Sequence, residues 1–222
     1  MSESGLFSRL YDPVMEVPEN LGLRRLREKA IEGLRGRVLE LGIGTGRNLP
    51  LYPDGVTHLA GVDPDEAMLD RARERARQAP FSVDLVPASA EELPFEDASF
   101  DAALATLAFC TIPDPQKALR EARRVLKEGA EFRLLEHVRM GREPVAWVQE
   151  KATPLWKRAA GGCHLDRDTL AAVREAGFEV ERVERHLGGL VLSVFARNPH
   201  VLRRPRTVKR ADPTRRGTEH ER

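Results

Sequence analysis

The stretch RVLELGIGTGRNLP, from Arg37 to Pro50, decides the fold class. A short apolar segment with an acid near its end, Glu40, runs into three glycines that alternate with other residues. Glycine loses more backbone entropy on folding than any other residue, so this density of glycines indicates close approach between the backbone and a ligand. A glycine-rich turn between a strand and a helix also presents backbone N–H groups to that ligand. The stretch therefore predicts a nucleotide-type site at the end of a buried strand.

Helix-like and strand-like segments alternate along the rest of the chain, which is typical of a mostly parallel sheet with helices on both faces. Helices are expected at 19–33, 64–79 with Pro64 at its start, 114–127 ended by Gly129, 143–159 broken near Pro154, and 166–177, with a short one after Arg47. Strands are expected at 37–41, 57–63, 81–88, 100–107, 131–138, 178–186 and 190–197. The last two should form an antiparallel hairpin through Gly188 and Gly189.

Length and composition fit one globular domain. The chain has 222 residues, of which 41% are hydrophobic and 32% are charged. We expect a single domain at 1–198, with an N-terminal cap over about 1–35. The two cysteines give no disulfide framework and no metal-ligand spacing, and they suit a reducing compartment. The sequence shows no signal peptide and no run of about 18 apolar residues that could span a bilayer, so a cytoplasmic location is expected.

The charge is distributed unevenly. From Pro199 to Arg222 there are eight basic and three acidic residues, a surplus of five. Since the whole chain carries +1, the part before Pro199 carries about −4. Residues 199–222 are poor in apolar side chains, so we expect a disordered, solvated basic tail. Such a tail can also make weak contact with an anionic membrane surface or a nucleic acid. An acidic body argues against a nucleic-acid partner.

The glycine pattern can be compared with three classes of ligand site. A phosphate-binding P-loop needs Gly-Lys-Ser/Thr, which the chain lacks. A dinucleotide site needs a third glycine where Arg47 stands. The remaining pattern, acid-x-Gly-x-Gly-x-Gly, comprises Glu40, Gly42, Gly44 and Gly46. It resembles motif I of the class I methyltransferases that use S-adenosylmethionine.

Two acids support this resemblance. Asp63 ends the next expected strand, where a carboxylate can accept hydrogen bonds from ribose hydroxyls. Glu40 would repel a pyrophosphate but attract the ammonium group of a methionine tail. The resemblance implies a Rossmann-like class I methyltransferase fold with a seven-stranded sheet, the cofactor S-adenosyl-L-methionine, and S-adenosyl-L-homocysteine as product.

A second stretch, PASAEELPFEDASFDAALATLAFC, is similar to the adenine-binding region of the same superfamily. Ser89 stands where the family often has aspartate, which implies a weaker contact to the adenine amino group, and Glu91 is expected to supply that contact instead. Ala90 would offer its backbone, and Thr106 would line the sulfonium pocket. The resemblance also places Tyr11, Pro64 and Met68 at the cofactor.

The acceptor side is indicated by the C-terminal half. The pieces EHV and GC-x-L-x-R are similar to alkyl-thiol S-methyltransferases and to phosphatidylethanolamine N-methyltransferase-like proteins. From this resemblance we expect His137 and His164 as catalytic groups, because histidine accepts a proton near neutral pH. The expected substrate-side residues are Cys110, Trp147, Cys163 and Arg167. No metal ligands are expected.

The leading hypothesis is a methyltransferase for a small-molecule acceptor, with a thiol slightly favoured, because a thiol with a pKa near ~8.5 needs little help to ionise. The alternative is an N-methyltransferase of a phospholipid headgroup at a membrane surface. A nicotinamide-dependent oxidoreductase and a non-catalytic cofactor-binding scaffold stay open as other classes. The sequence does not indicate an oligomeric state.

Overall fold

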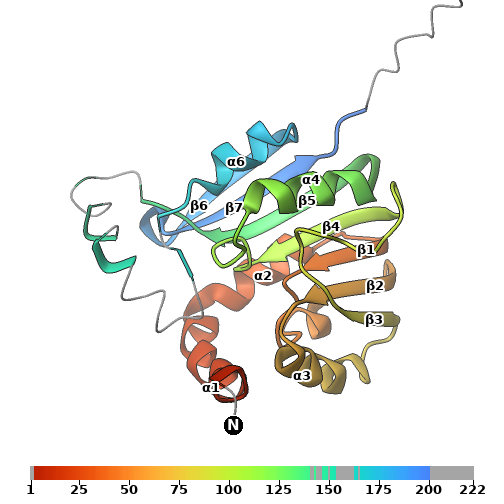
Figure 1. The fold of residues 1–222 in the computed structure, drawn as a ribbon, viewed down its shortest axis with the longest axis horizontal. Coiled ribbons are helices and arrows are strands. Elements are labelled where there is room, and N and C mark those ends of the chain that lie inside the picture. The colour runs from red at the N-terminus through yellow and green to blue at the C-terminus, as the bar shows by residue number, and fades with distance from the viewer. Residues whose placement is uncertain are drawn as a thin grey trace, which may run out of the picture.

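The computed structural model describes residues 3–140, 143, 147–149, 151–153, 163–164 and 166–200. Its centre is one seven-stranded sheet with the strand order β3-β2-β1-β4-β5-β7-β6 (Figure 1). The strands are β1 (Gly36–Leu41), β2 (Val56–Asp63), β3 (Ser82–Pro87), β4 (Phe100–Thr106), β5 (Leu126–His137), β6 (Glu179–His186) and β7 (Val191–Arg197). The predicted seven-stranded Rossmann-like sheet is confirmed.

Strands β1 to β5 are mutually parallel, and β1 lies between β2 and β4. Strand β7 pairs antiparallel with both β5 and β6, which confirms the C-terminal hairpin. The strand order reverses between β1 and β4, so the loops after these two strands meet at the switch point of the sheet. In open α/β sheets, ligands bind outside the carboxyl ends of the strands at this point.

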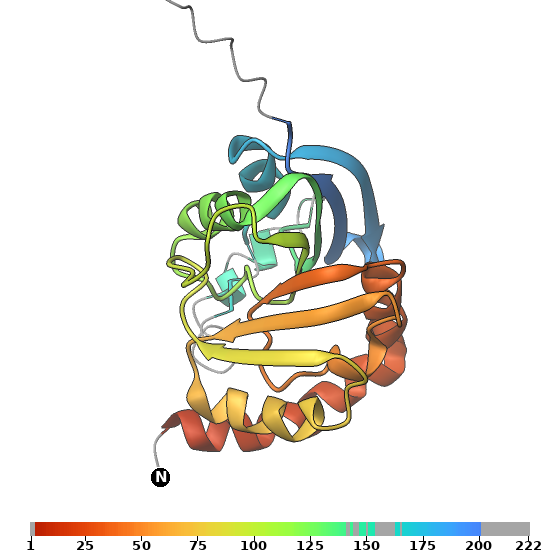
Figure 2. The same cartoon turned by 90° about the vertical axis from the view of Figure 1, so that its right-hand side faces the viewer.

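Helices cover both faces of the sheet (Figure 2). On one face lie α2 (Arg24–Ile31) and α3 (Glu66–Ala76), and on the other lie α4 (Pro115–Val125) and α6 (Thr169–Glu175). Side chains alternate along each strand, so that Ala103 faces α4 and α6 while Leu104 faces α2 and α3. The remaining helices are α1 (Glu3–Pro18), the π-helix η1 (Glu19–Leu23) and the 3₁₀ turns η2 (Leu49–Leu51) and η3 (Leu187–Gly189).

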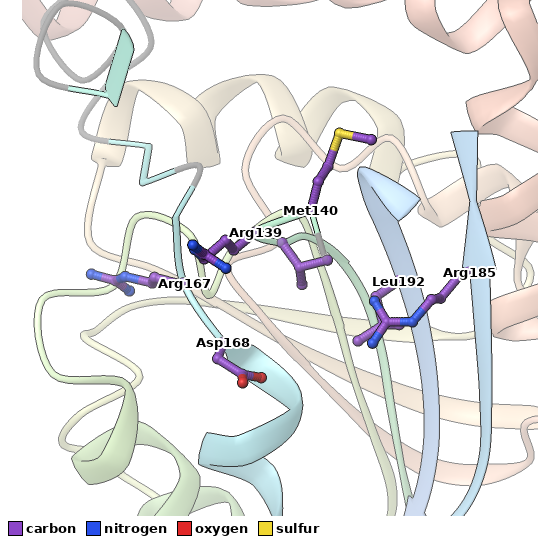
Figure 3. Close-up of a pocket in the computed structure, with 7 residues that line it drawn as sticks. Arg139, Met140, Arg167, Asp168, Arg185 and Leu192 are labelled. Atoms are coloured by element: carbon purple, nitrogen blue, oxygen red, sulfur yellow. The ribbon is translucent and has the colours of Figure 1, made fainter. Parts of the chain in front are cut away.

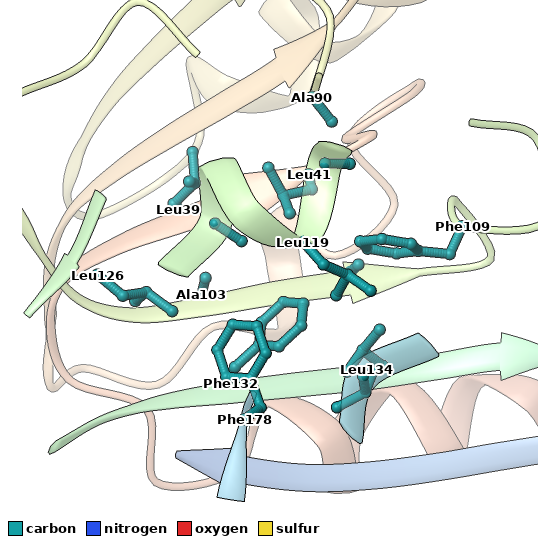
Figure 4. Packing of buried hydrophobic residues seen from close by; sticks show 14 of the residues in the cluster. Leu39, Leu41, Ala90, Ala103, Phe109, Leu119, Leu126, Phe132, Leu134 and Phe178 are labelled. Atoms are coloured by element: carbon teal, nitrogen blue, oxygen red, sulfur yellow. The ribbon is translucent and has the colours of Figure 1, made fainter. Parts of the chain in front are cut away.

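The core beneath α4 contains a cluster of aromatic rings (Figure 4). The rings of Phe132 and Phe178 stack with centroids 4.6 Å apart, and Phe109 meets Phe132 edge-on at 6.2 Å. Phe109 and Phe132 are fully buried, and Leu119 of α4 packs beside them. This packing fixes the loop after β4, which contains Phe109, against the sheet.

Three predicted elements differ from the structure. Pro64 precedes α3, because Asp65 caps the helix by accepting a hydrogen bond from the N–H of Ala67 at 2.9 Å. Helix α4 ends at Val125, and Gly129 lies inside β5. The reason is Asn198, whose side-chain amide donates to the carbonyls at the helix end: Arg123, Leu126 and Lys127.

The third difference concerns the N-terminal region. In place of one helix over 19–33, α1 runs into η1 and α2, with a break at Gly22, where φ is +122°. The bounds of the other predicted strands and helices agree with the structure to within a few residues. Of the expected 143–159 helix, only residue 143 and the helical turns at 147–149 and 151–153 are described, and Trp156 lies outside the described residues. The tail expected at 199–222 also lies outside them, apart from Pro199 and His200.

Candidate active site

The glycine-rich loop, residues 42–46, directly follows β1 and lies at the switch point of the sheet. Gly42, Gly44 and Gly46 all have positive φ, at +67°, +55° and +77°. A Cβ added to Gly42 would lie 2.5 Å from the Cβ of Ala108, and one added to Gly46 would lie 3.1 Å from the Cα of Ala72. These two glycines are therefore required by packing. A Cβ on Gly44 would meet nothing within 4 Å, so Gly44 is the glycine that faces open space.

Asp63 lies directly beside this open glycine. Its carboxylate accepts hydrogen bonds from the N–H groups of Gly44 and Asp65, both at 2.9 Å. Burial raises the pKa of Asp63, while these two N–H donors lower it. The side chain is half-buried at the end of β2. A carboxylate in this position, held by backbone donors and still reachable, is suited to accept hydroxyl groups of a ribose.

Beneath the loop lies a buried polar network that the sequence analysis did not anticipate. Arg27 of α2 is 3% exposed, and it donates to Glu19 at 2.8 Å and to the hydroxyl of Thr106 at 2.7 Å. It also donates to the side-chain oxygen of Asn48 at 3.1 Å. The Asn48 amide in turn donates to Glu40 at 2.6 Å and to Thr106 at 2.9 Å. The network therefore joins α2 to the ends of β1 and β4.

Glu40 is part of this network. Its two oxygens accept hydrogen bonds from Asn48 and from the hydroxyl of Tyr52, the latter at 2.8 Å. Burial raises the pKa of Glu40 to about 7, although the Tyr52 and Asn48 bonds and the charge of Arg27 lower it. Thr106 is likewise buried, with its hydroxyl engaged by Arg27 and Asn48. Direct contact of Glu40 or Thr106 with a cofactor stays a prediction.

Replacing Glu40 with glutamine tests this buried carboxyl. Its pKa of about 7 in the folded protein lies above the 4.5 of a free glutamate, so between these values the folded state binds more protons than the unfolded state. The free energy of unfolding should therefore fall as the pH rises from 4.5 to 7, by up to about 3 kcal/mol from this group. Over the same pH range, we expect the free energy of unfolding of Glu40→Gln to fall correspondingly less.

Urea unfolding at several pH values measures this difference. Glu28→Gln is the matched control, because Glu28 lies in an exposed pair with Arg24 on the surface of α2. Its pH profile should follow that of the wild type. Parallel profiles for wild type and Glu40→Gln would contradict the assignment of a raised pKa to Glu40.

Asp12 is a second residue that the sequence analysis missed. It accepts hydrogen bonds from the hydroxyl of Thr45 at 2.8 Å, from Arg47 at 2.9 Å and from Arg75 at 2.7 Å, and it pairs with Arg71 at 3.0 Å. These partners hold the pKa of Asp12 below its usual value, against the effect of burial. Helix α1 is therefore held against the glycine-rich loop and α3 mainly through Asp12, and the exposed Glu16 of α1 adds a pair with Arg47 at 3.5 Å.

The predicted adenine-binding residues form a compact turn after β3. The hydroxyl of Ser89 donates to Glu91 at 3.0 Å, and the N–H of Glu91 donates back to that hydroxyl at 3.2 Å. Glu91 also accepts a hydrogen bond from the N–H of Asp114 at 2.5 Å, which ties this turn to the start of α4. Ala90 is buried in the core beside them. The pairing of Ser89 with Glu91 holds both side chains in the same turn, and their contact with an adenine stays a prediction.

The other three expected cofactor residues surround the loop from different elements. Met68 is buried in the first turn of α3, and Pro64 is exposed in the segment before it. Tyr11 lies one residue before Asp12 on α1, and burial raises the pKa of its hydroxyl. Because Asp12 contacts Thr45 and Arg47, Tyr11 lies next to the part of α1 that contacts the glycine-rich loop. Their contacts to a cofactor stay predictions.

The acceptor-side candidates come together at the carboxyl ends of β4 and β5. Ligand atoms of Cys110, His137 and Cys163 all lie within 4.8 Å of one another, and both cysteines are buried. The N–H of His164 donates to the carbonyl of Cys110 at 2.8 Å. Arg167 donates to the carbonyls of Phe109 and Ile112 in the same loop. Four of the predicted residues therefore surround the loop that contains Cys110.

Glu136 holds this loop from below. One of its oxygens accepts hydrogen bonds from the N–H groups of Ala108 and Phe109, both at 3.0 Å. Burial raises the pKa of Glu136 to about 7, although these donors lower it. The acid of the EHV stretch therefore positions the loop after β4, and Ala108 of that loop is the residue that meets Gly42.

Trp147 is not among the contacts that join the acceptor-side residues within the described part of the chain. It is 56% exposed, and the ammonium of Lys151 lies 6.0 Å from its ring. The helical turn that contains it is attached to the end of β5 through Gln149. That side chain donates to the carbonyl of Val138 at 3.0 Å and accepts from the N–H of Met140 at 2.8 Å. A substrate contact for Trp147 stays a prediction.

A small cavity of about 140 Å³ lies beside the acceptor-side group (Figure 3). Arg139 and Arg167 line it together with Arg185 of β6, and Asp168 is the acidic side chain in its wall. The remaining lining residues are Val138, Met140 and Leu192. Three arginines and one aspartate line this space, although the Arg167 guanidinium donates to the carbonyls of Phe109 and Ile112 and that of Arg139 to Glu143.

Comparison with known proteins identifies the family. The family described as "Methyltransferase domain" matches residues 39–134. Thiol S-methyltransferase TMT1B of Rattus norvegicus is 33% identical over 163 residues, which cover 70% of this chain and 66% of that protein. Phosphatidylethanolamine N-methyltransferase of Cereibacter sphaeroides is 34% identical over 140 residues, covering 62% of this chain and 68% of that protein. The chain belongs to the S-adenosylmethionine-dependent methyltransferases.

A solved structure supports the same assignment. An S-adenosylmethionine-dependent methyltransferase of Thermotoga maritima, described as a possible histamine N-methyltransferase, has a TM-score of 0.63 and 27% identity. The match covers 86% of this chain and 97% of that one. The predicted family and cofactor are therefore confirmed. Within the part of the chain that the structure describes, no helix is both long enough and apolar enough to cross a membrane.

The residues at the switch point fit the cofactor of this methyltransferase family. The sulfonium group of S-adenosylmethionine supplies an activated methyl group, so the protein has to position two reactants and exclude water. Gly44 faces open space beside the half-buried carboxylate of Asp63. The glycines at 42 and 46 allow this loop to pack closely, because a side chain at either would collide with Ala108 or Ala72.

Proposed function

We propose that this methyltransferase transfers the methyl group of S-adenosylmethionine to the sulfur of a small thiol. The observation that carries the proposal is the group of Cys110, His137, Cys163 and His164 around the loop that follows β4. This loop contacts the glycine-rich loop through Ala108 and Gly42, so an acceptor bound there would lie next to the cofactor loop. The similarity to a thiol S-methyltransferase supports the same acceptor class.

The two predicted catalytic histidines differ in their surroundings. The side chain of His164 is 30% exposed, and its Nδ1 lies 3.7 Å from the carboxylate of Asp166. A reachable imidazole oriented by a carboxylate is suited to accept the proton of an acceptor thiol. The Nδ1 atom of His137 is buried, and a ring nitrogen of His137 lies within 4.8 Å of the sulfurs of Cys110 and Cys163. We therefore assign proton removal to His164.

Methyl transfer from labelled S-adenosylmethionine tests the acceptor. Small alkyl thiols and phosphatidylethanolamine vesicles are offered in parallel, and we expect label on the thiols. His164→Asn should lower turnover at pH 7 by about 10²-fold or more, the usual contribution of a general base. The defect should shrink near pH 9, because a thiol with a pKa of about 8.5 then ionises without help.

His200→Asn is the matched control, because His200 is an exposed histidine that pairs with Glu128 after the end of β7. It should retain full turnover. A defect in His164→Asn that is equal at pH 7 and pH 9 would contradict proton removal by His164, whereas label in the lipid would contradict a thiol acceptor.

The second candidate function is methylation of a phospholipid headgroup. The cavity lined by Arg139, Arg167 and Arg185 favours it, because guanidinium groups bind phosphate well (Figure 3). The similarity to a phosphatidylethanolamine N-methyltransferase points the same way. On this alternative, Arg185→Gln should reduce labelling of the lipid and leave thiol methylation unchanged. Removal of residues 199–222 should weaken vesicle binding at low salt.

A further inference from the structure

Three side chains of types that bind soft metal ions lie close together beside the glycine-rich loop. Cys110 follows β4, His137 is the last residue of β5, and Cys163 lies before α6. Their sulfur and ring-nitrogen atoms lie within 4.8 Å of one another. Both cysteines are buried, with 2% and 6% of their surfaces exposed, and His137 is half-buried. The sequence placed all three residues on the acceptor side but did not predict a metal site, because they are separated by 27 and 26 positions.

The spacing of these atoms is close to that of a tetrahedral metal site. Zinc binds thiolate at about 2.3 Å and imidazole at about 2.0 Å, so its ligands stand roughly 3.5–3.8 Å apart. Two thiolates and one imidazole are a ligand set that favours zinc, and three protein ligands leave a fourth position for a substrate. If the three ligand atoms moved closer together by about 1 Å or less, their spacing would match that of a tetrahedral zinc site.

The surroundings of His137 favour a cation over a pair of thiols. A side-chain hydrogen bond joins Cys110 to Cys163, and the Cys110 sulfur also lies 3.4 Å from the carbonyl of Leu107. These contacts give both sulfur atoms a hydrogen-bond partner. The buried Nδ1 of His137 finds no hydrogen-bond partner within the described part of the chain. A cation coordinated through this nitrogen would satisfy it, and a ring nitrogen of His137 lies within 4.8 Å of both sulfurs.

The backbone around the three side chains is already fixed. Glu136 binds the N–H groups of Ala108 and Phe109, and the N–H of His164 binds the carbonyl of Cys110. Arg167 binds the carbonyl of Phe109 from the other side. Such outer contacts orient the ligands of metal sites and keep them in place.

We propose that Cys110, His137 and Cys163 bind one Zn²⁺ ion, with a fourth position for the sulfur of the acceptor. Binding of the ion rests on the geometry alone, and the role of the ion rests on the proposed thiol methyltransferase function. An acceptor thiol bound to the ion gives its proton to His164 and becomes a thiolate. The thiolate sulfur then forms a bond to the methyl carbon, while the electron pair of the broken carbon–sulfur bond stays on the cofactor sulfur.

Metal binding by the full-length protein tests the site. Reduced, chelator-stripped protein is titrated with Zn²⁺ against a chromophoric chelator, and bound metal per chain is counted by mass spectrometry. We expect one Zn²⁺ per chain for the wild type and for the His200→Asn control. Cys110→Ser, Cys163→Ser and His137→Asn should each weaken binding by at least about 100-fold, because even partners outside the coordination sphere contribute 10–100-fold.

Cobalt gives a readout that does not depend on variants or on activity. Co²⁺ bound to the wild type should show a thiolate-to-metal absorption band, and a small alkyl thiol should shift that band. Failure of wild-type protein to bind a stoichiometric ion would overturn the site, as would a Cys110–Cys163 disulfide in the untreated protein. Retained binding in a folded Cys110→Ser protein, checked by circular dichroism, would overturn it as well.

The inference and the proposed function can fail separately. Stoichiometric metal together with methylation of lipid but no thiol would overturn the thiol function and support the site. Thiol methylation that is unchanged after stripping and in Cys163→Ser would support the function and overturn the role of the ion. Thiol methylation that is lost on stripping and restored by Zn²⁺ would support both.

Discussion

Replacing Arg27 with methionine is expected to lower the free energy of unfolding by about 3–5 kcal/mol. Arg27 is buried with Glu19, and removal of one partner of a buried ion pair leaves the other as an uncompensated charge. Arg27 also donates to Asn48 and Thr106, so these groups lose a donor in the same variant. Methionine retains much of the side-chain length, which limits the cavity that the change would create.

Urea unfolding of the variant measures this loss. Arg24→Met is the matched control, because Arg24 lies on the same helix in an exposed pair with Glu28 and should change stability by less than about 0.5 kcal/mol. The double variant Arg27→Met with Glu19→Gln should recover part of the loss, since no buried carboxylate would then stand alone. A single-variant loss below about 1 kcal/mol would contradict a structural role for the network.

Asp63→Ala is expected to weaken binding of S-adenosylmethionine by about 1.5–3 kcal/mol, which is roughly 10- to 150-fold. The carboxylate would accept the ribose hydroxyls, and hydrogen bonds to a charged group fall in this range. It also binds the N–H of Gly44, so the variant loosens the glycine of this loop that faces open space. Asp63→Asn should lose less binding free energy, because an amide oxygen can still accept a hydrogen bond from the N–H of Gly44.

Isothermal titration with S-adenosylmethionine and with S-adenosylhomocysteine measures this effect. Asp54→Ala is a suitable control, because Asp54 is an exposed aspartate in the turn before β2. Its affinity should equal that of the wild type. Unchanged affinity in Asp63→Ala, with folding intact, would rule out the ribose assignment.

The features that the sequence predicted well are those encoded within one strand, turn and helix. The alternating glycines at 42, 44 and 46 follow a buried strand directly, and Asp63 ends the next strand in the same way. Because parallel strands bring their carboxyl ends to one edge, local signals of this kind are sufficient to place both in space. The structure places both at the switch point, and the contact between Gly44 and Asp63 joins them.

The features that the sequence did not predict depend on contacts between distant segments. Arg27 resembles any other arginine of an arginine-rich helix until α2 packs against the ends of β1 and β4. Asp12 gains its role only when α1 meets Thr45 and α3. The end of α4 was misplaced for the same reason, because Asn198, more than 70 residues later, supplies its cap.

The place of β7 in the sheet has a consequence for synthesis of the protein. Strand β6 is made before β7, yet it joins the sheet through β7, which lies between β5 and β6. A chain emerging from the ribosome with its N-terminus first therefore completes β6 before any partner for it exists. Until Val191–Arg197 has emerged, β5 and β6 both present unpaired backbone edges, which are templates for association with other chains. A nascent chain halted in this interval should be the form most in need of a chaperone.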